Sequence, residues 1–114
     1  MRDIKFRAWK FSRNGLPAKM EHYEHMINNT MQYLSNEESF SNHRVIMQYT
    51  GLKDKNGVEI YEGDIIKNSF LTREVKYQQG GFMVSQWYLG KRDLGKIEVI
   101  GNIYENPELL KDNI

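Results

Sequence analysis

Turns that contain glycine and recur at short intervals are the feature that most constrains how this chain can fold. They lie at residues 14–15, 54–57, 62–64 and 78–81, and segments rich in β-branched and aromatic residues separate them. Glycine, Asn and Asp tolerate the positive φ angles of tight reversals, and short strands between such turns are typical of all-β folds. We therefore predict a mainly β protein.

Residues 4–11 carry the clearest strand pattern in the N-terminal part of the chain. Apolar and basic side chains alternate over most of this segment. A period of two places successive side chains on opposite faces of a strand. We predict a strand in which Lys5 and Arg7 form the solvent face opposite Phe6.

The segment that follows is harder to interpret. The 14–15 turn predicts a reversal into a short segment around residues 19–20. Residues 21–44 place Tyr, Met and Ile at helical spacing, whereas the Asn pair at 28–29 and the polar stretch 35–42 are typical of a loop. A helix followed by a loop, and a loop throughout, both stay open. A loop of that length exceeds ordinary connections and would suit a binding function.

The C-terminal two-thirds of the chain carries closely spaced strand signals. Closing such strands into a barrel removes exposed edges that would otherwise invite aggregation. We predict a small SH3-like or partly open β-barrel over residues 45–105. The expected strands are 45–49, 60–61, 65–68, 71–77, 82–88 and 96–104.

Two further signals concern the end of this barrel. The alternation of the last expected strand breaks at Gly101, which indicates a β-bulge. Asn106 followed by Pro107 is typical of an N-cap and the first position of a helix. We predict a short helical turn after residue 106.

Length and composition limit the classes of protein that remain. A chain of 114 residues fits one domain, which we divide into an N-terminal strand with a variable segment (1–44), a barrel portion (45–105) and a tail (106–114). The chain contains no cysteine, which excludes disulfides, cysteine nucleophiles and thiolate metal sites. A charged N-terminus and the lack of a long apolar run predict a cytoplasmic protein with no membrane partner.

Two clusters of side chains could have a metal-binding or catalytic role. His22 and His25 would share one face of a helix and could hold a divalent metal, but no third ligand is indicated. Asp54, Glu62 and Asp64 could serve in acid–base chemistry if a pocket raised the pKa of one of them. Turn formation explains these carboxylates more simply. Since no phosphate loop or nucleophile motif occurs, we expect no enzyme activity, no cofactor and no small-molecule substrate.

Basic residues interleaved with aromatic ones are the strongest functional signal. The net charge is +1, yet residues 1–20 hold six basic residues against one acidic residue. Small barrels that bind nucleic acid place cations on phosphates and rings on bases, although the same residues can simply form the wet face of a strand. The candidate interaction surface comprises Arg2, Lys5, Arg7, Trp9, Lys10, Tyr49, Lys53, Lys55 and Tyr61.

Three blocks of sequence, in order along the chain, resemble the YopX protein family of phages and prophages. They are IKFRAW at residues 4–9, MQYTGLKDKNG with IYEGDI at 47–65, and VIGNIYENPELL at 99–110. The resemblance implies a β-rich protein that is encoded in phages, prophages and other mobile elements and works in the cytoplasm of the bacterial host. It implies no reaction and no functional residues.

Three functions follow from these observations. The first is a non-enzymatic accessory protein that binds a phage or host protein, or itself, through barrel edges and the 21–44 segment. The second is a nucleic-acid-binding barrel that uses the basic and aromatic N-terminal strand. The third, a metal-dependent enzyme, would need His22, His25 and a carboxylate to converge.

Overall fold

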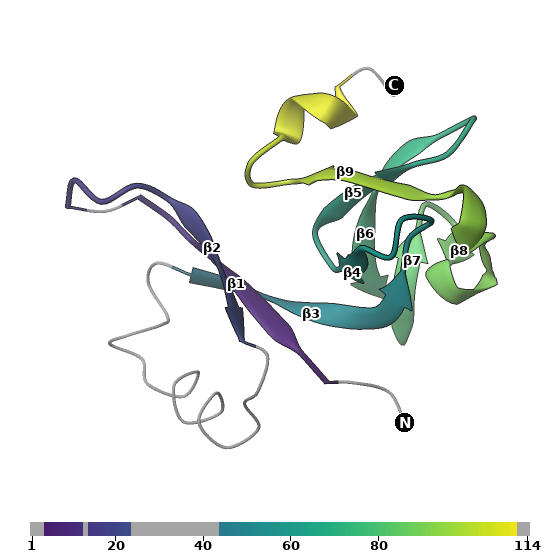
Figure 1. Ribbon diagram of the computed structural model, residues 1–114, viewed down its shortest axis with the longest axis horizontal. Helices are drawn as coiled ribbons and strands as arrows, with labels where there is room; N and C mark the ends of the chain where they lie inside the picture. Colours follow the sequence, from purple (N-terminus) through teal and green to yellow (C-terminus); the bar gives the residue numbers. More distant parts are fainter. Residues whose placement is uncertain (1–3, 13, 24–43, 112–114) are drawn as a thin grey trace. The chain divides into compact units, whose positions relative to one another are not determined.

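The computed structural model describes residues 4–12, 14–23 and 44–111 and confirms the predicted mainly β fold (Figure 1). The chain forms two compact units, residues 1–48 and 49–114. Within the described residues there is no α-helix, and three short 3₁₀ helices are the only helical elements.

The first unit contains a small antiparallel sheet. Strand β1 (Phe6–Lys10) lies between β2 (Lys19–Tyr23) and the first half of β3 (Arg44–Lys53). The 14–15 turn joins β1 to β2, with φ angles of 51° and 80° at its two residues. The predicted strand and reversal are therefore confirmed. The helix or loop expected within 21–44 begins as strand β2, and residues 24–43 lie outside the described part of the chain.

The expectation that Arg7 faces solvent is wrong. Arg7, Ala8 and Trp9 are buried in succession, so β1 has no uniformly wet face. One reason is the position of β1 as the central strand, because His22 on β2 and Met47 on β3 pair with Arg7 and flank it on the same face of the sheet. Opposite Arg7 on β3 lies Met47, and Arg7 Nη2 is 3.5 Å from the Met47 sulfur. Lys5 is half-buried.

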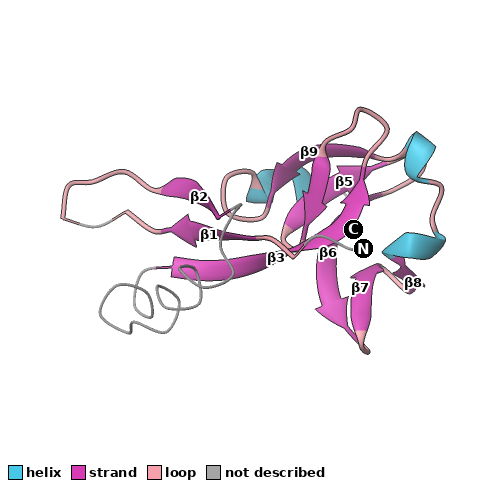
Figure 2. Ribbon diagram, turned by 60° about the horizontal axis from the view of Figure 1, so that its bottom comes forward, coloured by secondary structure: helices cyan, strands magenta, loops and turns pink. Residues whose placement is uncertain are grey.

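The second unit is a curled sheet that forms a partly open barrel, as predicted (Figure 2). The end of β3 pairs with β4 (Glu59–Tyr61). Five further antiparallel strands follow the order β8-β7-β6-β5-β9. Their bounds are β5 (Asp64–Lys67), β6 (Thr72–Gln78), β7 (Gly81–Val84), β8 (Trp87–Tyr88) and β9 (Glu98–Asn102).

Apolar side chains from these strands, from one 3₁₀ helix and from Ile97, the residue just before β9, form the core of the second unit. The helix η1 (Leu89–Lys91) follows β8, and η2 (Leu94–Lys96) precedes β9. Each core side chain is at most 5% exposed, so its burial favours folding by about 1.5–3 kcal/mol. The buried cluster comprises Ile60, Ile66, Val75, Val84, Leu89 and Ile97.

The single strand expected at 82–88 is in fact a hairpin. The chain reverses after Val84 through a two-residue turn, and Val84 pairs with Trp87 on β8. Ser85 adopts a φ of 56°, which is uncommon for a residue with a side chain. No glycine marks this reversal, so the sequence pattern did not reveal it.

The bulge predicted at Gly101 is confirmed. Ile65 pairs with Gly101 and Ile66 pairs with Val99, so one residue of β9 is extra. A Cβ at position 101 would lie 2.5 Å from Asn106 Oδ1, which explains why glycine is needed there.

The predicted C-terminal turn is confirmed as the 3₁₀ helix η3 (Pro107–Leu110). The side chain of Asn106 does not cap it, however. Its Oδ1 instead accepts a hydrogen bond from the Asn102 N–H at 3.3 Å, because the bulge brings that backbone donor within reach.

Candidate binding cleft

A tight turn between β5 and β6 forms one wall of a cleft in the second unit. Asn68 Oδ1 accepts hydrogen bonds from the N–H groups of Phe70 and Leu71, both at 2.8 Å. The Asn68 N–H donates to the Leu71 carbonyl at 3.0 Å. This closed turn holds Phe70 at its tip, where the side chain is 89% exposed.

The opposite wall comes from the segment between η1 and η2. The Arg92 N–H donates to the Leu89 carbonyl at 3.0 Å and fixes the backbone there. The Arg92 guanidinium lies 5.7 Å from the centroid of the Trp87 ring, within the range of a cation–π contact. Asp93 Oδ1 accepts the Gly95 N–H at 3.0 Å and so begins η2.

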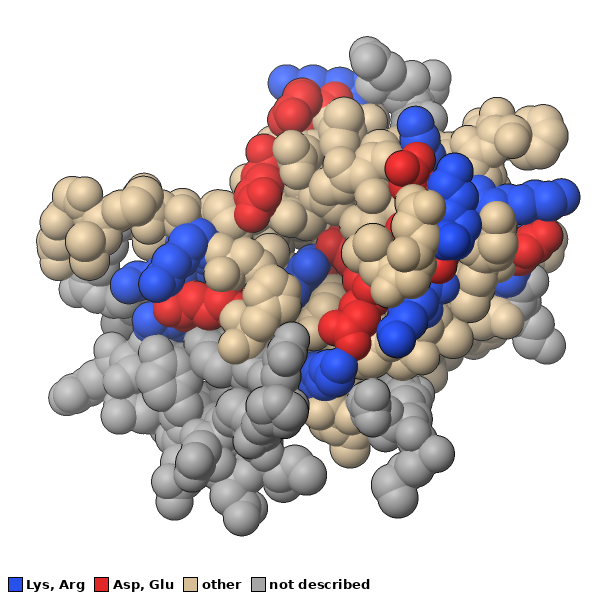
Figure 3. Space-filling view, viewed as in Figure 1, with Lys and Arg blue, Asp and Glu red and all other residues tan. Residues whose placement is uncertain are grey.

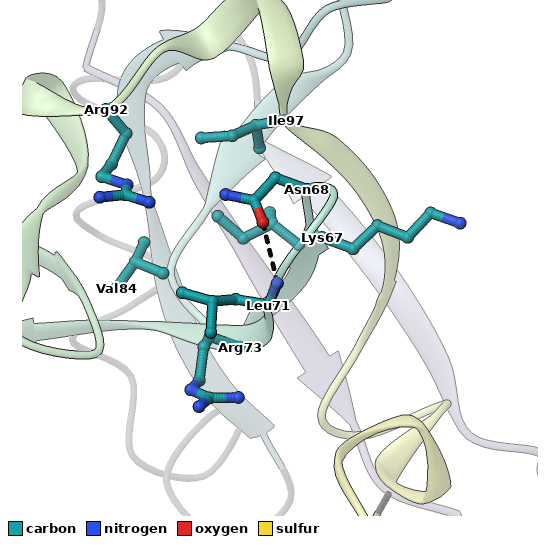
Figure 4. A pocket seen from close by; sticks show the side chains of 8 residues that line it. Lys67, Asn68, Leu71, Arg73, Val84, Arg92 and Ile97 are labelled. Atoms are coloured by element: carbon teal, nitrogen blue, oxygen red, sulfur yellow. Dashed lines mark hydrogen bonds between the residues drawn. The ribbon is translucent and has the colours of Figure 1, made fainter. Parts of the chain in front are cut away.

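Apolar core side chains form the floor of the cleft, and polar groups surround it (Figure 4). Ile66, Leu71, Val84 and Ile97 line its inner part. The outer part is an adjoining hollow of about 270 Å³ that shares Asn68, Arg92 and Ile97 with the inner part, and its other lining residues are Ser69, Phe70, Asp93 and Lys96.

Cations dominate the charge around the cleft. Four basic residues and one carboxylate line it, an excess of four minus one, or +3, in a chain of net charge +1. Lys67 extends away from the other labelled side chains in Figure 4 and lies 3.9 Å from Glu98. Asp93 lies 3.9 Å from Lys96, and both are largely exposed, so this pair is weak. Over the β8 side of the second unit, Lys and Arg gather with Asp and Glu between them (Figure 3).

The residues singled out from the sequence do not converge on this cleft. Arg7, Trp9, Tyr49 and Tyr61 are buried, and the Tyr49 and Tyr61 rings contact each other with their centroids 5.4 Å apart. Of the other predicted residues, Lys53 and Lys55 are exposed, Lys5 and Lys10 are half-buried, and Arg2 lies outside the described residues.

The sequence held a signal for the cleft that was missed. Trp87 and Tyr88 are followed closely by Lys91 and Arg92, the same mixture of rings and cations that drew attention to the N-terminal strand. Because the sequence pattern predicts a single strand over 82–88, it does not reveal the exposed edge at residues 87–88 beside a basic loop.

Two of the three carboxylates that the sequence suggested for acid–base chemistry, Asp54 and Asp64, accept hydrogen bonds from backbone N–H groups. Asp54 accepts hydrogen bonds from Asn56, Val58 and Val99, and Asp64 Oδ2 accepts the Tyr61 N–H at 2.8 Å. Burial raises the pKa of Asp54. The hydrogen bonds from three backbone N–H groups and the positive charge of Lys55 together lower it by more, so the pKa lies below 3.8. Turn formation is thus an observed role of both carboxylates.

The metal site considered as an alternative from the sequence falls largely outside the described residues. His22 lies exposed on β2, whereas His25 and His43 belong to the undescribed segment. Among the residues that the structure describes, no group of three His, Asp or Glu side chains could hold a metal ion.

The described helices are all too short to cross a membrane.

Comparison with known proteins decides the family. The model of the YopX protein family matches residues 5–111, nearly the whole chain. The chain belongs to the YopX protein family. This membership confirms the resemblance carried by the three sequence blocks.

A solved structure supports the fold of this YopX family member. The crystal structure of protein EF1440 from Enterococcus faecalis matches it with a TM-score of 0.58 and 29% sequence identity. The match covers 97% of this chain and 100% of that protein. A search of curated proteins found no significant match.

Proposed function

We propose that this YopX family member is a non-enzymatic accessory protein of phages and prophages. In this proposal it works in the cytoplasm of the bacterial host as a protein-interaction module that binds a protein partner or a second copy of itself. The observation that carries the proposal is the short edge strand β8, which presents two exposed aromatic residues. Trp87 is 55% exposed and Tyr88 is 43% exposed.

Strand β8 is an edge strand to which another chain could pair. It is the last strand of the five-stranded sheet, and within the described residues it pairs only with β7. An edge strand offers unpaired backbone donors and acceptors to another chain. A two-residue edge offers few of them, so the side chains would supply most of the contact energy.

The Tyr88 ring is held in place before any partner binds. It covers Gly81, where an added Cβ would lie 2.8 Å from two ring carbons. The Tyr88 hydroxyl donates a hydrogen bond to the Gln79 carbonyl at 2.9 Å. Ordered aromatic side chains lose little entropy on binding, and Trp and Tyr are enriched among the residues that dominate interface energies.

Other observations favour binding over catalysis. Asp54 and Asp64, which the sequence suggested for acid–base chemistry, are buried and bonded to backbone N–H groups. Burial of Arg7 and Trp9 argues against nucleic-acid binding through the N-terminal strand.

Size-exclusion chromatography with light scattering over a concentration series tests the proposal. We expect the wild type to self-associate and Trp87→Lys to be monomeric, because a charged side chain at an edge opposes strand pairing. Val58→Lys is the matched control, since Val58 is 47% exposed on the 54–58 turn and is not part of β8. A wild type that stays monomeric would overturn self-association. An oligomer that survives Trp87→Lys would place the interface elsewhere.

A further inference from the structure

We propose that the cleft between the β5–β6 turn and Arg92 binds single-stranded nucleic acid. Arg92 and Lys96, with Arg73 at the rim, would contact phosphates, while Phe70 and Trp87 would stack on bases. This binding site and ligand class go beyond the proposed role as a protein-interaction module.

The arginines have donors suited to phosphate. A guanidinium carries five N–H groups in a planar fork that matches two phosphate oxygens at once. Arg73 uses Nη1 to donate to the Thr72 carbonyl at 2.9 Å, which orients the group and leaves other donors for a ligand. Both Arg73 and Arg92 are half-buried, so part of the ordering of their side chains is complete before binding.

The Asn68 side chain adds a neutral donor. Two backbone N–H groups donate to its Oδ1, so the amide oxygen must face the turn and the amide nitrogen must face the other way. Figure 4 shows that nitrogen pointing into the pocket on the side of Arg92. Among the described residues, Asn68 Nδ2 donates to no acceptor. Its N–H groups could therefore donate to a phosphate or a base.

Exposed rings lie beside these donors. Phe70 lines the outer cleft and is 89% exposed, the largest exposure among the exposed large apolar side chains of the described residues. Trp87 is 55% exposed next to Arg92. Every base has a π face, so stacking on such rings is tolerant of sequence and typical of single-strand binding.

The combination favours single-stranded nucleic acid over other anionic ligands. The outer hollow of about 270 Å³ has room for about one nucleotide. Bases can stack on exposed rings such as Phe70 only where they are not paired within a duplex. The carboxylates of an acidic peptide could pair with the basic side chains but would offer no ring to stack on Phe70. Because the chain has a net charge of only +1 and Asp93 lies in the cleft, we expect modest affinity with a strong dependence on salt.

Fluorescence anisotropy of labelled oligo-dT and oligo-U at low salt tests the site. We expect both oligonucleotides to bind, and Phe70→Ala to weaken binding about tenfold through lost stacking. Arg92→Gln should weaken binding and reduce the slope of log affinity against log salt by about 0.7. Lys76→Gln removes the same charge from an exposed residue of β6 that does not line the cleft, and should leave binding unchanged.

Two further measurements distinguish a loss of oligonucleotide binding at the cleft from a loss of folding and from a change in self-association. Thermal unfolding should show that the variants fold as the wild type does, because the substituted side chains are partly or fully exposed. In ¹H–¹⁵N spectra of the wild type, oligo-dT should shift the Asn68 side-chain amide and the Trp87 indole signals, whatever the state of self-association.

Three results would overturn the proposal. The first is no binding of either oligonucleotide at low salt. The second is an equal loss in Arg92→Gln and Lys76→Gln, which would indicate a general charge effect. The third is tighter binding of a polyglutamate peptide than of the oligonucleotides, which would assign the cleft to an acidic protein partner.

Discussion

Asp54→Asn is the substitution that tests most directly what holds the curled sheet together. Asp54 is 7% exposed, and its Oδ1 accepts N–H groups from Asn56 at 2.8 Å and Val58 at 2.9 Å. Its Oδ2 accepts the Val99 N–H at 2.8 Å. The first two bonds close the turn between β3 and β4, and the third ties that turn to β9, 45 residues further along the chain.

The magnitude follows from these contacts. Asparagine keeps one oxygen for Asn56 and Val58 but places an NH₂ group against the Val99 N–H. The change removes one hydrogen bond to a charged group, about 1.5–3 kcal/mol, and leaves two donors facing each other. We expect the free energy of unfolding to fall by about 2–4 kcal/mol in total. For a chain of this length the melting temperature should fall by about 10 °C or more.

The pH dependence adds a second test. Backbone hydrogen bonds and Lys55 hold the pKa of Asp54 in the folded protein below 3.8, its ordinary value in an unfolded chain. The stabilisation is therefore fully present above pH 3.8 and is lost as the pH falls through the folded pKa. The deficit of Asp54→Asn relative to the wild type should shrink in acid.

Urea unfolding at neutral and acidic pH measures both effects. Asp93→Asn is the matched control, because it removes one carboxylate charge while asparagine can still accept the Gly95 N–H at the start of η2. Its loss should stay below about 1 kcal/mol. The reasoning would be refuted by a loss of less than about 0.5 kcal/mol for Asp54→Asn, or by a deficit that stays constant in acid.

Two predictions concern packing. Gly101→Ala would place a Cβ 2.5 Å from Asn106 Oδ1 and should lower the free energy of unfolding by about 1–3 kcal/mol in urea; an unchanged midpoint would show that the Asn106 side chain moves aside easily. Leu89→Ala, at a fully buried position, should cost about 2–5 kcal/mol, whereas Leu16→Ala, at a side chain 58% exposed, should cost almost nothing in the same assay. Equal losses in the two leucine variants would contradict the assignment of Leu89 to the core.

The edge strand and the cleft share Trp87, so their tests must be kept apart. Trp87→Lys changes both the β8 edge and the ring beside Arg92, and it is therefore used only for self-association. Phe70 lies outside β8, so Phe70→Ala reports on the cleft, whereas Arg92→Gln also removes the cation–π contact with Trp87 and can affect the β8 edge as well. A protein that self-associates but binds no oligonucleotide would support the interaction module alone. A monomer that binds oligonucleotides would support the cleft alone.

Much of the fold could be predicted because its signals are local. The turns at 14–15 and 54–57 depend on residues that adopt positive φ or accept hydrogen bonds from their own backbone, and both turns form where expected. The bulge at Gly101 was visible as a break in alternation, and Pro107 marked the start of η3. Such features depend on the residues beside them in sequence, so sequence alone reveals them.

The candidate sites could not be predicted in the same way. Alternation predicts that Arg7 faces solvent, but Arg7 is buried on the central strand of its sheet, with a residue of β2 and a residue of β3 on either side of it. Ser85 turns the chain without a glycine, and this reversal creates the β8 edge and sends Arg92 towards the β5–β6 turn.

Local sequence patterns therefore predict the mainly β composition and the positions of most turns, and the three sequence blocks indicate the family. Which basic and aromatic side chains are exposed together depends on how the strands pair and pack. Exposure depends on neighbours that are distant in the chain: Asn68 and Arg92 line one cleft although 23 residues (69–91) lie between them in the sequence. No local pattern carries that information, because side-chain burial is a property of the assembled sheet.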